Sequence, residues 1–154
     1  MKIEYNNLYT HFIFTTLHRL PLISEKHRQR IEKYITGKVN NNDSHLYVIY
    51  ANPEHVHLLM SRSPKLSEET LACTVAESSQ QFINQNKLYE SHFAWQESAS
   101  AFSLSKSDVD RVCKYTLNQP AHHRKVSFTE EYEEFIKFYQ KTLQPSKKES
   151  VRIR

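Results

Sequence analysis

The sequence contains a single glycine, Gly37, among its 154 residues. Phosphate-binding loops of the Walker A type and the dinucleotide-binding fingerprint both need several glycines at fixed offsets, because the backbone must approach the phosphates closely. The scarcity of glycine therefore excludes a P-loop ATPase and a Rossmann dehydrogenase, and we expect no nucleotide cofactor.

Cysteines and long apolar runs are also scarce. The two cysteines, Cys73 and Cys113, form no CxxC pair, and the N-terminal stretch MKIEYNNLYTH has no apolar core of the kind that directs export. We therefore expect a cytoplasmic protein whose cysteines are reduced, half-buried thiols. No run of about 18 apolar residues occurs, so no membrane span is expected.

The overall composition is that of a globular protein. Apolar residues make up 38% and charged residues 25%, a balance that excludes both a disordered chain and a membrane protein. The formal net charge of +4 is compatible with a polyanionic partner, although solubility also explains a modest excess. Basic residues cluster at 26–30, 122–125 and 147–154. Each cluster is either a solvated face or loose tail, or a phosphate contact.

The strands are indicated by β-branched and aromatic residues between turn signals. One is LYTHFIFTT, and two others, HLYVIYA and HVHLLM, are joined by the turn residues NPE. FAWQ and AFSLS are expected to form a further, short pair. The predicted strands therefore cover residues 8–16, 45–51, 55–60, 93–96 and 101–105.

The helices are indicated by apolar residues at helical spacing behind capping residues. Ser105 with Asp108, and Ser127 with Glu130, have the spacing of a capping box. NNND (40–43) is expected to form a turn after the first helix. The predicted helices run from Ser24 to about Gly37, from Ser67 through Ile83, from Ser105 to Pro120 and from Ser127 to Leu143.

The order of these elements predicts an α+β fold. Hairpin-connected strands favour a mostly antiparallel sheet with helices packed on it, and a ferredoxin-like or RRM-like arrangement is the natural candidate. We expect one domain over residues 1–145, followed by a loose, polar and basic tail at 146–154.

Two histidines lie two residues apart in the stretch HVHLL. Side chains alternate between the faces of a strand, so His55 and His57 should point the same way, roughly 7 Å apart, while Val56, Leu58 and Met60 face the core. Two imidazoles on one face can converge on a cation. They can equally be ordinary polar residues on an exposed sheet face.

The stretch KYTLNQ offers a further ligand and a nucleophile. On a helix, Tyr115 and Gln119 lie one turn apart on the same face. An amide oxygen can bind a hard cation such as Mg²⁺ or Mn²⁺, and the tyrosine could attack a group that the metal polarises. Tyr115 could also be a half-buried aromatic residue. Tyr132 and Tyr139, in register with the apolar face of the last predicted helix, are expected in the core.

Taken together, these segments resemble the single-tyrosine HUH transposases of the 200/605 type of insertion sequence, which include relatives associated with repetitive extragenic palindromes. The resemblance covers nearly the whole chain, through YTHFIFTTLHRLPLI, NPEHVHLL, FAWQESASAFSLS and VCKYTLNQPAHHRKVSFTEEYEEFIKFY. HVHLL matches the HUH motif, in which U is a bulky apolar residue, and YTLNQ matches the nucleophile helix.

This resemblance implies that His55, His57 and Gln119 hold a divalent metal ion, Mg²⁺ or Mn²⁺, and that Tyr115 is the nucleophile. The implied activity is metal-dependent cleavage and rejoining of single-stranded DNA at hairpin-marked element ends, through a 5′-phosphotyrosine and without ATP. It also implies a homodimer, in which the tyrosine helix can complete the partner's metal site. The candidate DNA contacts are Arg19, Arg111, Lys114, His122, His123, Arg124 and Lys125.

One segment departs from the family pattern. Members usually carry glycines after AWQ, as in GYGAFS, whereas this chain has ESASAFS.

Other interpretations of the function stay open. The protein could be a host-domesticated relative that cleaves palindromic repeats, or a non-catalytic nucleic-acid-binding module whose binding survives chelation and Tyr115→Phe. A metallohydrolase lacks support, because the sequence contains no HExxH motif and no carboxylate-rich ligand set.

Overall fold

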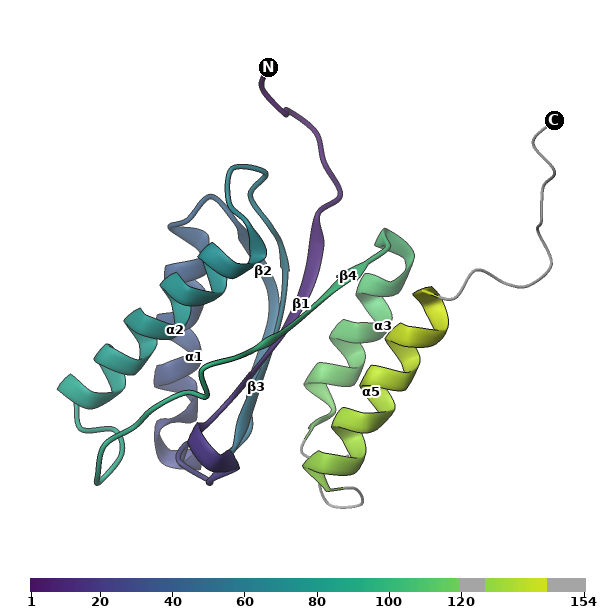
Figure 1. Cartoon of the computed structure of the whole chain (residues 1–154). Coiled ribbons are helices and arrows are strands. Elements are labelled where there is room, and N and C mark those ends of the chain that lie inside the picture. The colour runs from purple at the N-terminus through teal and green to yellow at the C-terminus, as the bar shows by residue number, and fades with distance from the viewer. Residues whose placement is uncertain (120–126, 144–154) are drawn as a thin grey trace, which may run out of the picture. The chain divides into compact units, whose positions relative to one another are not determined.

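The computed structural model describes residues 1–119 and 127–143. The chain divides into two compact units, Met1–Gln119 and Pro120–Arg154. The first contains a sheet and its helices (Figure 1), and the second contains helix α5 (Phe128–Leu143). The expected tail at 146–154 lies outside the described residues, and the single domain over 1–145 stays a prediction.

The sheet of the first unit has four antiparallel strands. They are β1 (Tyr9–Thr15), β2 (His45–Ala51), β3 (His55–Ser61) and β4 (Ser100–Leu104), in the spatial order β2-β3-β1-β4. With the helices between them, the order along the chain is β-α-β-β-α-β, the ferredoxin-like pattern. The predicted α+β fold with an antiparallel sheet is therefore confirmed.

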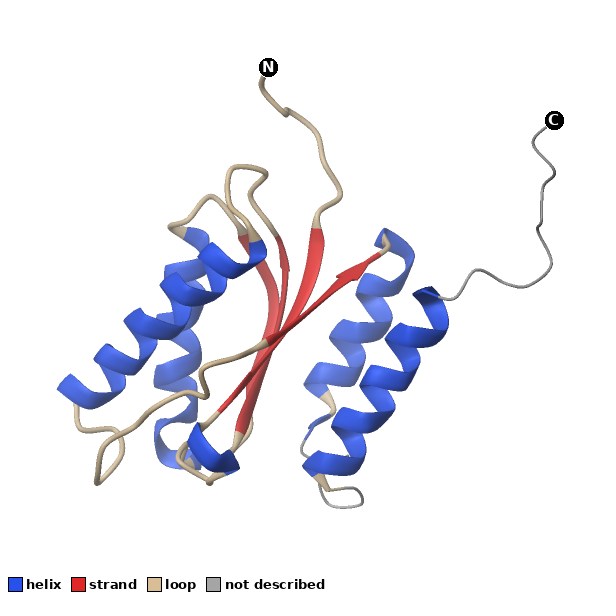
Figure 2. Ribbon diagram, in the orientation of Figure 1, coloured by secondary structure: helices blue, strands red, loops and turns tan. Residues whose placement is uncertain are grey.

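Helices cover both faces of the sheet. Figure 2 shows α1 (Glu25–Asn40) and α2 (Glu68–Gln85) on one side and α3 (Lys106–Leu117) on the other. The main core lies between the sheet and the first two helices, because alternate strand residues point there. It includes Phe12, Phe14, Val56, Leu58, Met60, Ile31, Ile35, Leu71 and Val75.

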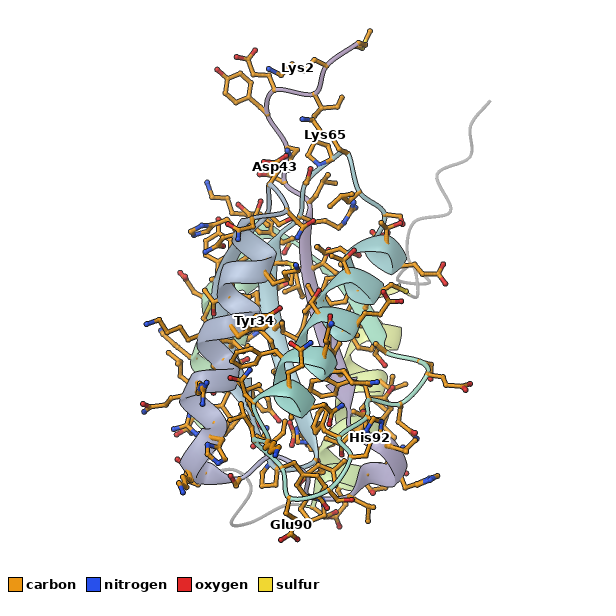
Figure 3. All side chains as sticks on the ribbon, turned by 90° about the vertical axis from the view of Figure 1, so that its left-hand side faces the viewer. Lys2, Tyr34, Asp43, Lys65, Glu90 and His92 are labelled. Atoms are coloured by element: carbon orange, nitrogen blue, oxygen red, sulfur yellow. The ribbon has the colours of Figure 1, made fainter. Side chains whose placement is uncertain are left out.

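Ring and charge contacts join the elements on the α1 and α2 side. The ring of Tyr34 on α1 stacks on that of Phe82 on α2, with centroids 4.0 Å apart and planes 8° from parallel. Figure 3 shows Tyr34 between the two helices. At one end of the sheet, Lys65 lies 4.0 Å from the Asp43 carboxylate and links the loops before β2 and after β3.

Two helix starts agree with the predicted caps. Ser67 accepts a hydrogen bond from the backbone N–H of Thr70 at the start of α2. The predicted capping box before α5 is confirmed, because the Ser127 N–H donates to the Glu130 carboxylate at 3.0 Å and the Glu130 N–H donates to the Ser127 hydroxyl at 3.4 Å.

Other predicted helix boundaries were wrong. Helix α1 continues to Asn40 because Gly37 lies on its exposed side in ordinary helical geometry, so the predicted turn starts one residue later, at Asn41. Ser24 precedes α1 without a side-chain cap bond. The Ser105 hydroxyl donates to the Asp108 carboxylate at 2.9 Å instead of closing a capping box. Helix α3 ends at Leu117, whereas the predicted helix continued to Pro120.

Residues 93–96 do not form the predicted strand. Side chains of α2 bind two of their backbone N–H groups: the Phe93 N–H donates to Asn84 Oδ1 at 2.8 Å, and the Trp95 N–H donates to Gln80 Oε1 at 3.0 Å. Only an isolated bridge joins Trp95 to Thr16. Strand β4 therefore pairs with β1 alone.

The glycine-free segment after Gln96 lines a cavity of about 370 Å³ together with Phe12, Phe14 and residues of α2. Because Phe12 and Phe14 belong to the main core, this cavity opens on the α2 side of the sheet. Ser100, at the end of this segment, pairs with Ile13, which also pairs with His57, so the departure from the family pattern reaches the histidine face of the sheet.

The two cysteines have different environments. Both are free thiols, and Cys113 on α3 is half-buried as expected, whereas Cys73 on α2 is exposed. Cys73 lies on the outer side of an amphipathic helix, so the expectation of a half-buried thiol was wrong there. In the described part of the chain, no helix has the length and apolar character needed to cross a membrane.

Candidate active site

The histidines of the HVH motif lie side by side on β3, facing α3. His55 and His57 are 0% and 1% exposed, and they pair with Thr15 and Ile13 of β1. Val56 between them lies in the main core on the opposite face. The predicted alternation is confirmed, whereas the alternative of two polar residues on an exposed sheet face is wrong.

The two imidazoles point their Nε2 atoms at each other. His55 Nε2 lies 3.1 Å from His57 Nε2, with the ring planes 82° apart. The opposite nitrogen of each ring also has a partner. His55 Nδ1 lies 3.0 Å from Glu54 Oε1, and His57 Nδ1 lies 2.9 Å from His11 Nε2 on β1.

The turn between β2 and β3 brings an amide to the same point. The Asn52 backbone N–H donates to the His55 carbonyl at 2.8 Å. This bond closes the turn and fixes the backbone from which the Asn52 side chain extends. Asn52 Nδ2 then lies 3.1 Å from His55 Nε2 and donates to Gln119 Oε1 at 3.2 Å. Asn52 and Gln119 are both buried.

Tyr115 and Gln119 reach the histidines from α3 and from the residues just after it. The buried side of α3 consists of Val109, Val112 and Thr116. Tyr115 lies at the edge of this side, half-buried, with its ring centroid 6.2 Å from that of His57 and the planes 81° apart. The structure thus brings together the four residues that the sequence singled out for chemistry.

The candidate DNA contacts are more scattered. Arg111 lies one turn before Tyr115 on α3 and forms an ion pair with Asp108 at 2.8 Å. Lys114, next to Tyr115, is exposed. Arg19 is exposed at the end of a short 3₁₀ turn, Leu17–Arg19, with a positive φ of 54°. The other four candidates, at 122–125, lie outside the described residues.

Three residues of this cluster were missed by sequence reasoning. Asn52 and Glu54 belong to the NPE turn directly before HVH, so their position beside the motif was an available signal. His11 had no such signal, because it lies 46 residues away from His57 in the sequence. Strand pairing alone brings it near.

The donor set suits a divalent cation. If the Nδ1 protons of His55 and His57 point to their outer partners, two Nε2 lone pairs face each other at 3.1 Å. A cation placed between these two nitrogens would be bound by both lone pairs. The Gln119 amide oxygen, joined to His55 through Asn52, adds an oxygen donor, and such mixed nitrogen and oxygen sets are typical of divalent metals.

Comparison with known families decides the identity of the chain. The family model described as "Transposase IS200 like" matches residues 4–119, which is more than half of the sequence. The chain belongs to this transposase family. The match ends at Gln119, where the first compact unit also ends, and it includes His55, His57, Tyr115 and Gln119.

Two solved structures share the fold of this IS200-like transposase. One is a protein from Deinococcus radiodurans R1 described as a putative transposase, with 18% identity and a TM-score of 0.54, and the match covers 77% of this chain and 96% of that one. The other is a REP-associated tyrosine transposase bound to a REP hairpin, with 15% identity, a TM-score of 0.58, and coverage of 82% and 74%. No curated protein matches the sequence at a comparable level of significance.

Proposed function

We propose that this IS200-like transposase cleaves and rejoins single-stranded DNA at hairpin-marked ends, with Tyr115 as the nucleophile. The observation that carries the proposal is the position of the Tyr115 ring beside His57, whose Nε2 lies 3.1 Å from that of His55. A phenol next to two convergent imidazole nitrogens can act on a phosphate held at that point.

In the proposed step, Tyr115 Oη forms a bond to the phosphorus of a phosphodiester. The phenol gives up its proton, the bond from phosphorus to the 3′ oxygen breaks, and that oxygen takes up one proton and leaves as a 3′-hydroxyl. The DNA end stays on the protein as a 5′-phosphotyrosine. Rejoining is the reverse step with a different 3′-hydroxyl, and the balance of bonds requires no ATP.

In this proposal His55, His57 and Gln119 hold a divalent cation, Mg²⁺ or Mn²⁺. When bound there, the cation supplies Lewis-acid stabilisation of the phosphate charge. The protein residues supply the orientation: Asn52 holds Gln119 against His55, and α3 holds Tyr115 against His57. Burial of the two histidines limits the access of water to this point.

The substrate class and assembly are part of the same proposal. One solved relative is described as bound to a REP hairpin, which supports hairpin DNA as the partner. Exposed Lys114 and the Arg111 side chain lie within one turn of Tyr115, where phosphates of a bound strand could be contacted. We further propose a homodimer, which sedimentation velocity on the purified chain would test.

The test is a covalent-adduct assay. The purified full chain is mixed with labelled single-stranded DNA from the flanks of its own gene and Mg²⁺ or Mn²⁺, and run on a denaturing gel. We expect a metal-dependent protein–DNA band that is absent with chelator, with duplex DNA and with Tyr115→Phe. Tyr34→Phe is the matched control, because Tyr34 stacks on Phe82 on the other side of the sheet.

Each outcome bears on a different part of the proposal. A band that persists in Tyr115→Phe would show that another group is the nucleophile. DNA binding that survives both chelation and Tyr115→Phe, with no adduct in the unaltered protein, would instead favour a non-catalytic binding module. An adduct formed only with DNA carrying paired hairpins would support hairpin-marked ends as the substrate.

A further inference from the structure

His11 on β1 contacts the outer nitrogen of His57. We propose that His11 is a positioning residue that keeps His57 in the tautomer whose Nε2 carries a lone pair, and that Glu54 does the same for His55. The inference rests on the proposed metal-binding role of His55 and His57. It assigns a function to two residues that the sequence pattern did not single out.

Strand register brings His11 to His57. In the antiparallel pair, Ile13 lies opposite His57 and His11 lies opposite Leu59. His11 and Ile13 are two residues apart and share a face, so His11 is the diagonal neighbour of His57, within reach of a long side chain. Its Nε2 lies 2.9 Å from His57 Nδ1, and the ring centroids are 5.2 Å apart.

Burial makes this contact selective. His11 is 0% and His57 1% exposed, so a nitrogen that lost its hydrogen-bond partner would have little water to replace it. A neutral imidazole carries one N–H and one lone pair. When His57 Nδ1–H donates to His11 Nε2, the lone pair of His57 must be on Nε2, which faces His55.

Glu54 orients His55 in the same way, with a carboxylate in place of an imidazole. Its Oε1 lies 3.0 Å from His55 Nδ1, and a carboxylate can only accept there, so the His55 proton is held on Nδ1. The Glu54 backbone is fixed as well, because its carbonyl accepts from the Thr16 N–H at 2.9 Å and from the Thr16 hydroxyl at 3.0 Å. Each proposed ligand is therefore oriented by its own partner.

Outer partners of this kind matter for metal binding. A hydrogen bond to the second nitrogen of a ligand histidine fixes the ring and the tautomer, and its loss typically costs about 10- to 100-fold in metal affinity. We therefore expect His11→Phe to weaken Mn²⁺ binding by about 10- to 100-fold. His11→Gln should restore most of the affinity, because the Gln side chain can place an acceptor oxygen where Nε2 was.

The experiment has two readouts on the full-length protein. Long-range ¹H–¹⁵N NMR of the metal-free protein, labelled at histidine, reports the tautomer of His57, and isothermal titration with Mn²⁺ alone reports affinity. We expect His57 as Nδ1–H in the unaltered chain and in His11→Gln, and a shift toward Nε2–H in His11→Phe. His45→Phe is the matched control, because His45 is exposed on β2.

The two readouts separate this inference from the proposed function. An Nε2–H tautomer of His57 in the unaltered protein would overturn the inference without any variant, even if His11→Phe failed to fold. Unchanged Mn²⁺ affinity in a folded His11→Phe would also overturn it. If the unaltered protein bound no Mn²⁺, the proposed metal site would fail, while the tautomer would still decide whether His11 orients His57.

Discussion

The side-chain amide of Asn52 donates to Gln119 Oε1 across 3.2 Å, joining the turn before β3 to the residue that follows α3. The same nitrogen lies 3.1 Å from His55 Nε2. One buried amide thus links a residue of the HVH motif to a residue 67 positions from the turn. Because Asn52 is 3% exposed, this link is shielded from water.

Asn52→Asp should destabilise the metal-free protein and make it respond more strongly to metal. The substitution replaces the donor amide by a carboxylate, which faces Gln119 Oε1 and His55 Nε2 without a proton to give. Loss of a buried donor costs about 1–3 kcal/mol. If the proposed metal site forms, the added carboxylate can bind Mn²⁺, so the loss of stability measured by urea unfolding should be smaller with Mn²⁺ than without it.

Asn40→Asp is the control for this substitution. Asn40 Oδ1 accepts from the Leu46 N–H at 3.2 Å, a contact that a carboxylate retains. An Asn52→Asp protein as stable as the unaltered chain in the absence of metal would contradict the proposed donor role of Asn52.

Leu58→Ala should reduce stability without altering the chemistry of the site. Leu58 is 0% exposed and faces the main core, on the opposite side of β3 from His57. Truncation of a buried leucine typically lowers the free energy of unfolding by about 2–5 kcal/mol. Urea unfolding of Leu58→Ala measures this loss. The Mn²⁺ affinity of the folded fraction should stay unchanged, and a parallel loss of affinity would show that the two faces of β3 are coupled.

Lys114→Gln should weaken DNA binding and reduce its dependence on salt. Lys114 is exposed and adjacent to Tyr115. Neutralising one phosphate contact on a single strand should lower the slope of log affinity against log salt by about 0.7. Fluorescence anisotropy with a labelled hairpin measures this slope, and Lys33→Gln, exposed on α1 across the sheet, should leave it unchanged.

Acid should loosen the start of α5 through Glu130. Hydrogen bonds from the Ser127 backbone N–H and hydroxyl hold the pKa of Glu130 below its ordinary value of 4.5. Because the folded pKa is depressed, the stabilisation is present above the ordinary value and is lost as pH falls through the folded value. Chemical shifts of residues 128–131 should move over this range, and Glu130→Gln should abolish that movement.

Alkylation should modify Cys73 before Cys113. Burial, and then the nearby Asp110 charge, raise the pKa of the Cys113 thiol above its ordinary value of 9.0, so less thiolate is available. Cys73 is exposed on α2. Mass spectrometry after brief iodoacetamide treatment should find the label first on Cys73, and equal rates would contradict the half-buried position of Cys113.

Much of the fold could be predicted because its signals are local. Alternation along HVHLL placed His55 and His57 on one face with Val56 in the core, and the capping pattern located the start of α5. The pattern at 93–96 misled for a physical reason: the N–H groups of Phe93 and Trp95 donate to Asn84 and Gln80 of α2 and are not available to a neighbouring strand. A strand-like sequence cannot show that another element occupies its hydrogen bonds.

By itself, the sequence determined the four strands of the sheet, the approximate positions of the helices, the placement of two imidazoles on one face and the spacing of Tyr115 and Gln119. Only the tertiary structure decided which residues surround them. His11 reaches His57 through the register of β1 on β3, and Asn52 reaches Gln119 through the packing of α3 on the sheet. Both contacts join distant segments, and periodicity along a chain carries no information about register between strands or about how a helix packs.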